Sequence, residues 1–132
     1  MTRQRYDEHS TEFGLWLREQ EQIESGRGYV TTNLDYVWYN YKTGQWMLLE
    51  EKRYGAGLTF PQRKMFGLLD DVASSDVMYL GFYLIVFERT SPNDGGVDLN
   101  GSRISACDLL EFLQFKKPDV WYQGLFNKRR GA

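Results

Sequence analysis

Two carboxylates and a lysine, placed at the ends of two short apolar runs, are the residues of this sequence whose types and spacing best suit chemistry. Asp35 stands near the start of the first run, and Glu50 and Lys52 stand at the end of the second. Paired carboxylates can hold a hard divalent cation such as Mg²⁺, with carbonyl oxygens and waters completing the octahedron. Such a cation neutralises phosphoryl charge and generates a hydroxide-like nucleophile, so this set suits phosphodiester hydrolysis.

The two runs predict a β-hairpin that would position these side chains. Aromatic and aliphatic side chains predominate in residues 34–41 and 46–49, and Gly44 provides a turn between them. A two-residue turn or a four-residue loop would pair Tyr41 with Trp46 and fix the register of every residue beyond. The position of the candidate residues therefore depends on the length of the turn.

This register decides whether the candidate residues share a face of the hairpin. It pairs Asp35 with Lys52 and places both on the face that carries Glu50, because side chains alternate along a strand. A three-residue loop would slip the pairing by one residue and send Asp35 to the opposite face. The backbone carbonyl of Glu51 can turn toward a shared ion, which makes Glu51 a third predicted ligand. The competing pair, Glu51 with Arg53, would occupy the opposite face without a lysine.

Two further polar residues are candidates for the same site. Residues 10–25 have apolar residues at helical spacing, and Glu12 lies on the border of that apolar stripe. A second helix is predicted to begin after Thr59, with Gln62 on the same side as its apolar residues. Each candidate has a structural alternative: Glu12 can simply favour the positive helix N-terminus, and Gln62 can complete a capping box with Thr59. The sequence leaves both alternatives open.

The remaining elements predict an α/β fold with a mixed central β-sheet flanked by helices. Residues 29–32 are compatible with a further short strand, so two or three strands are expected before the second helix. Residues 77–88 indicate a strand covered on both faces, and 97–105 indicate another short strand. Ser105 is the predicted cap of a last helix that ends near Phe115.

Length and composition predict a single domain spanning residues 1–132. Residues 116–132 form a C-terminal tail that is too apolar to be disordered, and it is expected to pack on the domain or on a second copy. The only cysteine, Cys107, excludes an internal disulfide and is interpreted as a small core residue. The only histidine, His9, is interpreted as a solvated residue before the first helix.

The charge balance limits the partners that the chain can have. The net charge of −2 argues against a protein that grips nucleic acid through bulk positive charge. No apolar run is long enough to span a membrane, and residues 1–10 contain no apolar segment that could serve as a signal peptide. We therefore expect a cytoplasmic protein without membrane contact.

Asp35, followed after fourteen intervening residues by Glu50, Glu51 and Lys52, resembles the motif of the PD-(D/E)xK nuclease superfamily. The resemblance implies a restriction endonuclease-like core of order α-β-β-β-α-β, in which a helix precedes the hairpin that carries the motif and a helix and a strand follow. It also implies that Asp35 and Glu50 are metal ligands and that Lys52 is the catalytic lysine.

Other positions match the family pattern less closely. Glu12 is similar to the first-helix acid of several branches, and Gln62 with Phe66 is similar to their Gln-xxx-Tyr element, with Phe in place of Tyr. Leu34 stands where the proline that names the family would be. The resemblance covers about residues 10 to 90 and implies nothing about the remainder.

A deoxyribonuclease that depends on Mg²⁺ or Mn²⁺ is the function that these residues and the resemblance predict, with DNA favoured over RNA as the partner. A junction or double-strand cutter of this size would need two copies, so a homodimer is a further expectation. The alternative from another class is a catalytically inactive nucleic-acid-binding or assembly module with a nuclease-like fold. A toxin-like or RNA-directed nuclease that uses the same residues is a third hypothesis.

Overall fold

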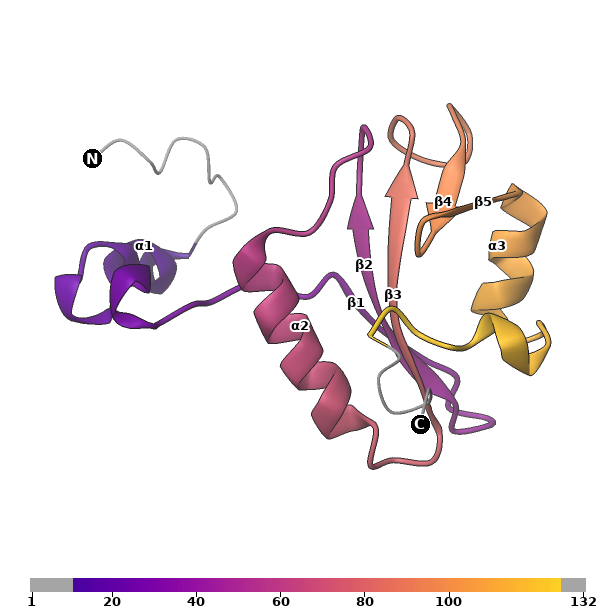
Figure 1. The fold of residues 1–132 in the computed structure, drawn as a ribbon, viewed down its shortest axis with the longest axis horizontal. Coiled ribbons are helices and arrows are strands. Elements are labelled where there is room, and N and C mark those ends of the chain that lie inside the picture. The colour runs from indigo at the N-terminus through magenta and orange to yellow at the C-terminus, as the bar shows by residue number, and fades with distance from the viewer. Residues whose placement is uncertain (1–10, 127–132) are drawn as a thin grey trace. The chain divides into compact units, whose positions relative to one another are not determined.

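The computed structural model describes residues 11–126 and divides the chain into two compact units, Met1–Thr31 and Thr32–Ala132 (Figure 1). His9 lies outside the described residues. The second unit contains the β-sheet and all of the residues that the structure assigns to a hydrophobic core.

The described part of the first unit contains one short α-helix, α1 (Glu12–Arg18), followed by two 3₁₀ turns, η2 (Glu21–Ile23) and η3 (Ser25–Arg27). The Thr11 side chain caps α1 by accepting a hydrogen bond from the Gly14 N–H at 3.0 Å. The prediction of one continuous helix over residues 10–25 is therefore wrong. A helix of this length gains most of its stability from packing, and α1 has no buried residue.

A five-stranded mixed sheet is the centre of the second unit, which makes the fold α/β as predicted. The strands lie in the order β1-β2-β3-β4-β5, and only β2 and β3 are parallel. Their bounds are β1 (Tyr36–Tyr39), β2 (Trp46–Lys52), β3 (Tyr79–Phe87), β4 (Val97–Leu99) and β5 (Ser102–Ile104). The parallel pair is joined by the helix α2 (Phe60–Ala73), and the helix α3 (Ala106–Leu113) follows β5.

The hairpin of β1 and β2 has a longer connection than the sequence suggested. Tyr39 pairs with Trp46, whereas the predicted register paired Tyr41 with Trp46. The connection runs from residue 40 to residue 45 because Asn40 organises it: its side chain accepts from the Lys42 N–H at 2.9 Å and its carbonyl accepts from the Gly44 N–H at 2.8 Å. The pairing is displaced by two residues, and an even displacement leaves every side chain on its predicted face.

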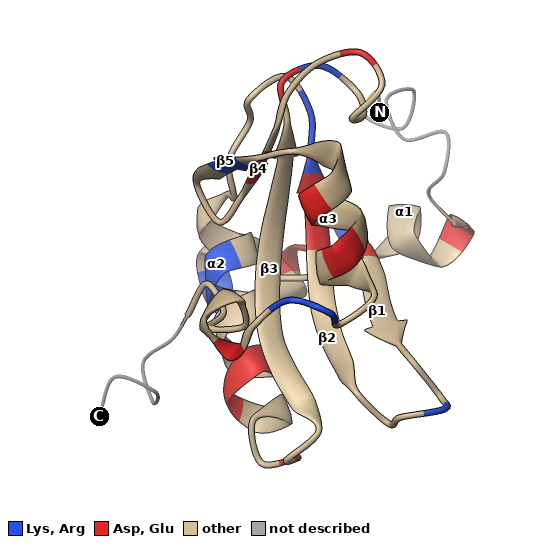
Figure 2. Ribbon diagram, turned by 90° about the vertical axis from the view of Figure 1, so that its right-hand side faces the viewer, with Lys and Arg blue, Asp and Glu red and all other residues tan. Residues whose placement is uncertain are grey.

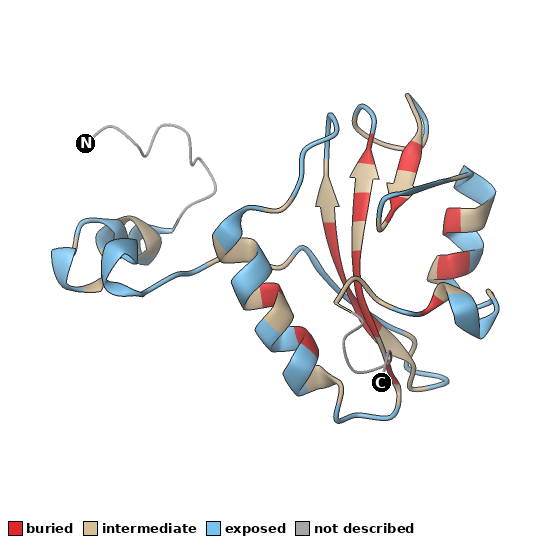
Figure 3. Ribbon diagram, in the orientation of Figure 1, coloured by how far each residue is buried: buried red, intermediate tan, exposed pale blue. Residues whose placement is uncertain are grey.

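The two helices cover opposite faces of the sheet (Figure 1). On the α2 side, Phe66 stacks on Phe82 with ring centroids 4.9 Å apart, in a cluster with Leu48 and Tyr79. On the α3 side, a larger cluster surrounds Tyr83 and includes Met47, Leu49, Phe112 and Tyr122. Figure 3 shows that burial follows the middle of the sheet and the inner sides of both helices. Alternate residues of β2 thus anchor the strand to both layers.

The described part of the tail, residues 116–126, packs against the sheet and α3 within the second unit. It contains the 3₁₀ turn η4 (Asp119–Trp121). The Tyr122 hydroxyl donates to the Phe112 carbonyl at 2.9 Å, and the Leu125 N–H donates to the Phe82 carbonyl at 2.8 Å. The tail therefore contributes to both core clusters.

Three local expectations differ from the structure. Residues 29–32 form no strand, so the described chain has two strands before α2, the smaller of the two numbers expected and one fewer than the core that the resemblance implies. Residues 97–105 form two short strands, because Asn100 and Gly101 adopt positive φ angles of 48° and 90° and turn the chain between β4 and β5. Cys107 is exposed, because the buried positions of α3 are Leu109 and Phe112.

The capping predictions are confirmed. The Thr59 hydroxyl accepts from the Gln62 N–H at 3.2 Å at the start of α2, and the Ser105 hydroxyl accepts from the Asp108 N–H at 2.9 Å at the start of α3. Within residues 11–126, no helix has the length and apolar character that crossing a membrane requires.

Candidate functional site

Asp35 and Glu50 lie side by side at the edge of the sheet. Asp35 directly precedes β1, and the β1–β2 register places it opposite Glu50. The Asp35 N–H donates to Glu50 Oε1 at 3.2 Å, and Asp35 Oδ2 accepts from the Glu51 N–H at 2.9 Å. These two bonds fix both carboxylates where β1 begins and β2 approaches its end.

Gln62 connects this carboxylate pair to Lys52. Its Oε1 accepts from Lys52 Nζ at 2.9 Å, and its Nε2 donates to Glu50 Oε2 at 3.4 Å. The same Oε1 accepts from the Thr59 N–H at 3.0 Å, which completes a capping box. Gln62 is therefore both a helix-capping residue and a member of the polar cluster, so its two alternative roles are combined in one side chain.

Glu50 is the buried member of the cluster, with 4% of its surface exposed. Burial, and after it the neighbouring charge of Asp35, raise the pKa of Glu50 from 4.5 to about 7. The hydrogen bond from the Asp35 N–H and the positive charge of Lys52 act in the opposite direction. At neutral pH this carboxyl group is therefore poised between its protonated and its ionised form, and a cation would favour the ionised form.

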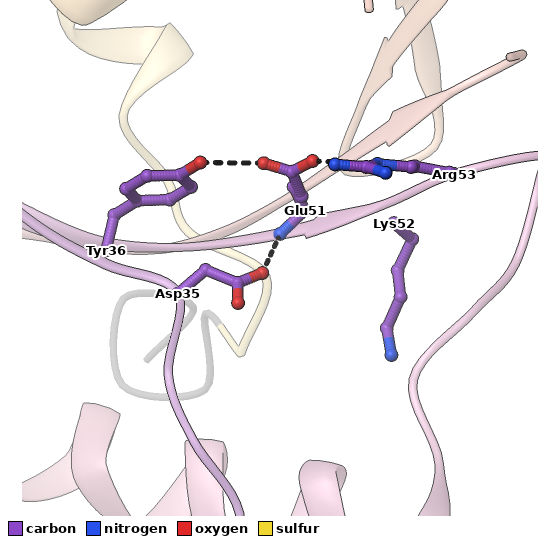
Figure 4. Close-up of a pocket in the computed structure, with 5 residues that line it drawn as sticks. All are labelled: Asp35, Tyr36, Glu51, Lys52 and Arg53. Atoms are coloured by element: carbon purple, nitrogen blue, oxygen red, sulfur yellow. Dashed lines mark hydrogen bonds and ion pairs between the residues drawn. The ribbon is translucent and has the colours of Figure 1, made fainter. Parts of the chain in front are cut away.

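Glu51 points to the opposite face of β2 (Figure 4). Its carboxylate accepts from the Tyr36 hydroxyl at 2.7 Å and from Arg53 Nε at 3.3 Å. The hydrogen bond to Glu51 raises the pKa of Tyr36. Figure 4 shows the Lys52 side chain extending from the other side of the strand, the side on which Asp35 lies. The Glu51 carboxylate and Arg53 thus form a separate ion pair, as the alternation of the strand requires.

The backbone of Glu51, unlike its side chain, faces the carboxylates. Its N–H bonds to Asp35. The N–H and C=O of one strand residue point to the same neighbour, so the Glu51 carbonyl leaves β2 on the Asp35 side. An open pocket at this edge is lined by Asp35, Tyr36, Glu51, Lys52 and Arg53.

The donor set fits a hard divalent cation with several water ligands. Asp35 and Glu50 supply two carboxylates and Glu51 supplies a carbonyl, all of them oxygen donors. Among the described residues, no group of three or more His, Cys, Asp and Glu side chains is arranged to hold a metal ion. Figure 2 shows the acidic and basic segments of β2 together in its C-terminal half.

The structure brings four of the predicted residues together: Asp35, Glu50, Lys52 and Gln62 all belong to the second unit. Glu12 belongs to the first unit, where it is an exposed residue in the first turn of α1. Tyr36 was not among the predicted site residues, and it fixes the Glu51 carboxylate on the far face by a hydrogen bond. Its position directly after Asp35, at the start of the first predicted strand, is the feature of the sequence that could have pointed to it.

Comparison with protein-family models, with curated proteins and with solved structures found no match. The assignment of a function therefore rests on the geometry of this chain alone.

Proposed function

We propose that this protein is a metal-dependent nuclease that hydrolyses phosphodiester bonds in DNA, with a site formed by Asp35, Glu50, Lys52 and Gln62. One observation carries the proposal. The buried carboxylate of Glu50, whose pKa is raised, contacts both Asp35 and Gln62, and Gln62 in turn accepts a hydrogen bond from Lys52. Strongly perturbed carboxyl groups with specific partners are characteristic of functional sites.

The cation, when bound, would supply charge neutralisation at the phosphoryl group and an ionised water as nucleophile. Asp35 and Glu50 would hold it, together with the Glu51 carbonyl. Lys52 would stabilise the negative charge that develops in the transition state, because its ammonium group is oriented by the Gln62 amide oxygen at 2.9 Å. Gln62 would position both Lys52 and Glu50 without contacting the phosphate.

The fold supports the same proposal. A helix, a hairpin that carries the acids and the lysine, a connecting helix and a parallel strand follow one another in the order that the PD-(D/E)xK resemblance implies. The described chain has one strand fewer before α2 than that core. Membership of the superfamily is accordingly part of the proposal.

The test is cleavage of supercoiled, linear duplex and single-stranded DNA with 5 mM Mg²⁺ or Mn²⁺, concentrations on the order of those used for weakly held cations. We expect Asp35→Ala, Glu50→Ala and Lys52→Ala to reduce cleavage by about a hundredfold or more while circular dichroism shows a folded protein. EDTA should abolish the activity of the wild type.

Glu51→Gln is the matched control, because its side chain points away from the carboxylate pair and its carbonyl is retained. We expect it to keep most of the wild-type activity. Full activity of a folded Lys52→Ala variant, or activity in EDTA, would contradict the mechanism. Binding of Mn²⁺ and DNA without any cleavage would favour the inactive binding module.

A further inference from the structure

Exposed aromatic residues flank the candidate site just after β2 ends and where α2 begins. Tyr54 and Phe60 each have 70% of their surface exposed. Tyr54 follows Lys52 by two residues, and Phe60 precedes Gln62 by two residues. Because Lys52 Nζ and Gln62 Oε1 are 2.9 Å apart, the connection begins and ends at the site. Figure 3 shows most of this connection in the colour of exposed residues.

Tyr54 is held in a conformation that a tyrosine rarely adopts. Its φ angle is +54°, in the left-handed region that favours glycine and asparagine. Its N–H donates to the Arg89 carbonyl at 3.0 Å, beside the end of β3, which fixes the backbone. A side chain that is mostly exposed gains little packing energy to offset this strain, and strained residues of this kind cluster at functional sites.

The charge around the two rings favours a polyanion. The sequence from Arg53 to Leu69 contains three cations and no acid. Arg53 pairs with Glu51, so the positive charge that faces a ligand comes from Arg63 and Lys64. The side chains of Arg63 and Lys64 are exposed, and Lys64 Nζ lies 5.4 Å from the centre of the Phe60 ring. A stacking ring with a cation beside it can bind a base and its neighbouring phosphate together.

These observations favour unpaired DNA over duplex DNA as the substrate. In a duplex the faces of the bases are stacked inside the helix, where protein rings cannot reach them without disrupting the stack, whereas an unpaired strand exposes them. The net charge of −2 also disfavours binding that depends on gripping many phosphates of a duplex. We propose that the substrate is unpaired DNA, whose bases stack on Tyr54 and Phe60 while its backbone enters the site at Lys52. The inference rests on the proposed nuclease function.

The experiment compares a fluorescein-labelled single-stranded 15-nucleotide oligo-dT with the matching duplex, a length on the order of one single-strand binding site. Anisotropy in EDTA measures binding, and gel electrophoresis with Mn²⁺ measures cleavage. We expect wild-type protein to bind and cleave the single strand about tenfold or more better than the duplex. The Tyr54→Gly/Phe60→Ala variant should lose about tenfold or more in affinity for the single strand.

Two controls separate stacking from folding. Tyr54→Phe keeps the ring and should stay within about twofold of the wild type in single-strand binding. Tyr41→Ala removes a ring that is 78% exposed in the β1–β2 connection, at the other end of β1 from Asp35, and should have no effect on binding. Tyr54→Gly should raise the thermal midpoint, because glycine relieves the strain at this φ angle.

The outcomes distinguish this inference from the proposed function. Metal-dependent cleavage of duplex as efficient as that of the single strand, or a double variant that binds the single strand like wild type, would overturn the inference and leave the nuclease intact. Absence of cleavage of any DNA would overturn the nuclease. In that case a loss of single-strand binding in the double variant would still support stacking on Tyr54 and Phe60.

Discussion

At the scale of single residues, the chemistry of the site depends on the burial of Glu50 next to Asp35. Two adjacent carboxylates, one of them withdrawn from water, destabilise the ionised state. A proton relieves that cost at low pH, and a divalent cation would relieve it at neutral pH. The position of Lys52 on the far side of Gln62 offsets the cost only in part.

The first prediction concerns the effect of Glu50→Gln on stability. The pKa of Glu50 is 4.5 when unfolded and about 7 when folded, so its stabilising contribution is present below pH 4.5 and is lost as the pH rises through 7. Without divalent cations, Glu50→Gln should therefore increase the free energy of unfolding by about 2–3 kcal/mol at pH 8 and have little effect at pH 4. Urea denaturation at both pH values measures the difference.

The control for this substitution is Glu21→Gln, an exposed glutamate of the first unit, which should change stability equally little at both pH values. Equal free energies of unfolding for wild type and Glu50→Gln at pH 8 would contradict the prediction, because they would show that ionised Glu50 does not destabilise the folded protein. With Mn²⁺ present, we expect the order to reverse, because only the wild type retains both ligands.

At the scale of secondary-structure elements, α2 connects the fold to the site through its first turn. The capping box joins Thr59 and Gln62, and the Gln62 side chain then contacts both Lys52 and Glu50. A helix terminus is a rigid support for such a group, because its capping bonds fix the side-chain rotamer. Phe66, one turn further along, holds the helix against the sheet by stacking on Phe82.

The second prediction compares two caps. Gln62→Ala removes half of the capping box of α2, and Ser105→Ala removes the cap of α3, which lies on the other face of the sheet. Each should lower the free energy of unfolding by about 1 kcal/mol. Only Gln62→Ala should also lower metal-dependent cleavage, by about tenfold or more, because Lys52 loses its orienting partner.

Thermal unfolding and initial cleavage rates measure the two effects on the same samples. If Gln62→Ala and Ser105→Ala had the same effect on cleavage, Gln62 would act only through the stability of its helix.

At the scale of the whole molecule, the described core belongs to the unit that begins at Thr32. The third prediction is that a variant lacking residues 1–31 unfolds cooperatively and binds Mn²⁺ like the full chain, because Asp35 and Glu50 are both retained. Calorimetry and Mn²⁺ titration test this. A variant that fails to unfold cooperatively would contradict it.

The shortened variant, together with Glu12→Ala in the full chain, tests the role of Glu12. Glu12→Ala in the full chain should match the wild type in Mn²⁺ affinity, because the ligand set that we propose, Asp35, Glu50 and the Glu51 carbonyl, does not include Glu12. A loss of cleavage in both Glu12→Ala and the shortened variant, with folding intact, would add Glu12 to the residues that act on the substrate.

Local signals in the sequence determined much of this architecture. Thr59 and Ser105 cap helices because a hydroxyl can satisfy free N–H groups at a helix start, whatever the rest of the fold does. The apolar run that forms β3 indicated a strand covered on both faces. The two-residue period of a strand was enough to place Glu50 and Lys52 on one face and Glu51 on the other.

Tertiary structure decided what depends on contacts between distant residues. Asn40 set the length of the hairpin connection, so Asp35 lies opposite Glu50 and not opposite Lys52. The alternation of side chains along a strand does not specify this pairing. Cys107 became exposed because the buried face of α3 is defined by the sheet beneath it. The pKa of Glu50 rises because α2 and the sheet together exclude water from it. Desolvation arises only when these layers assemble, so it cannot be predicted from the spacing of residues in the sequence.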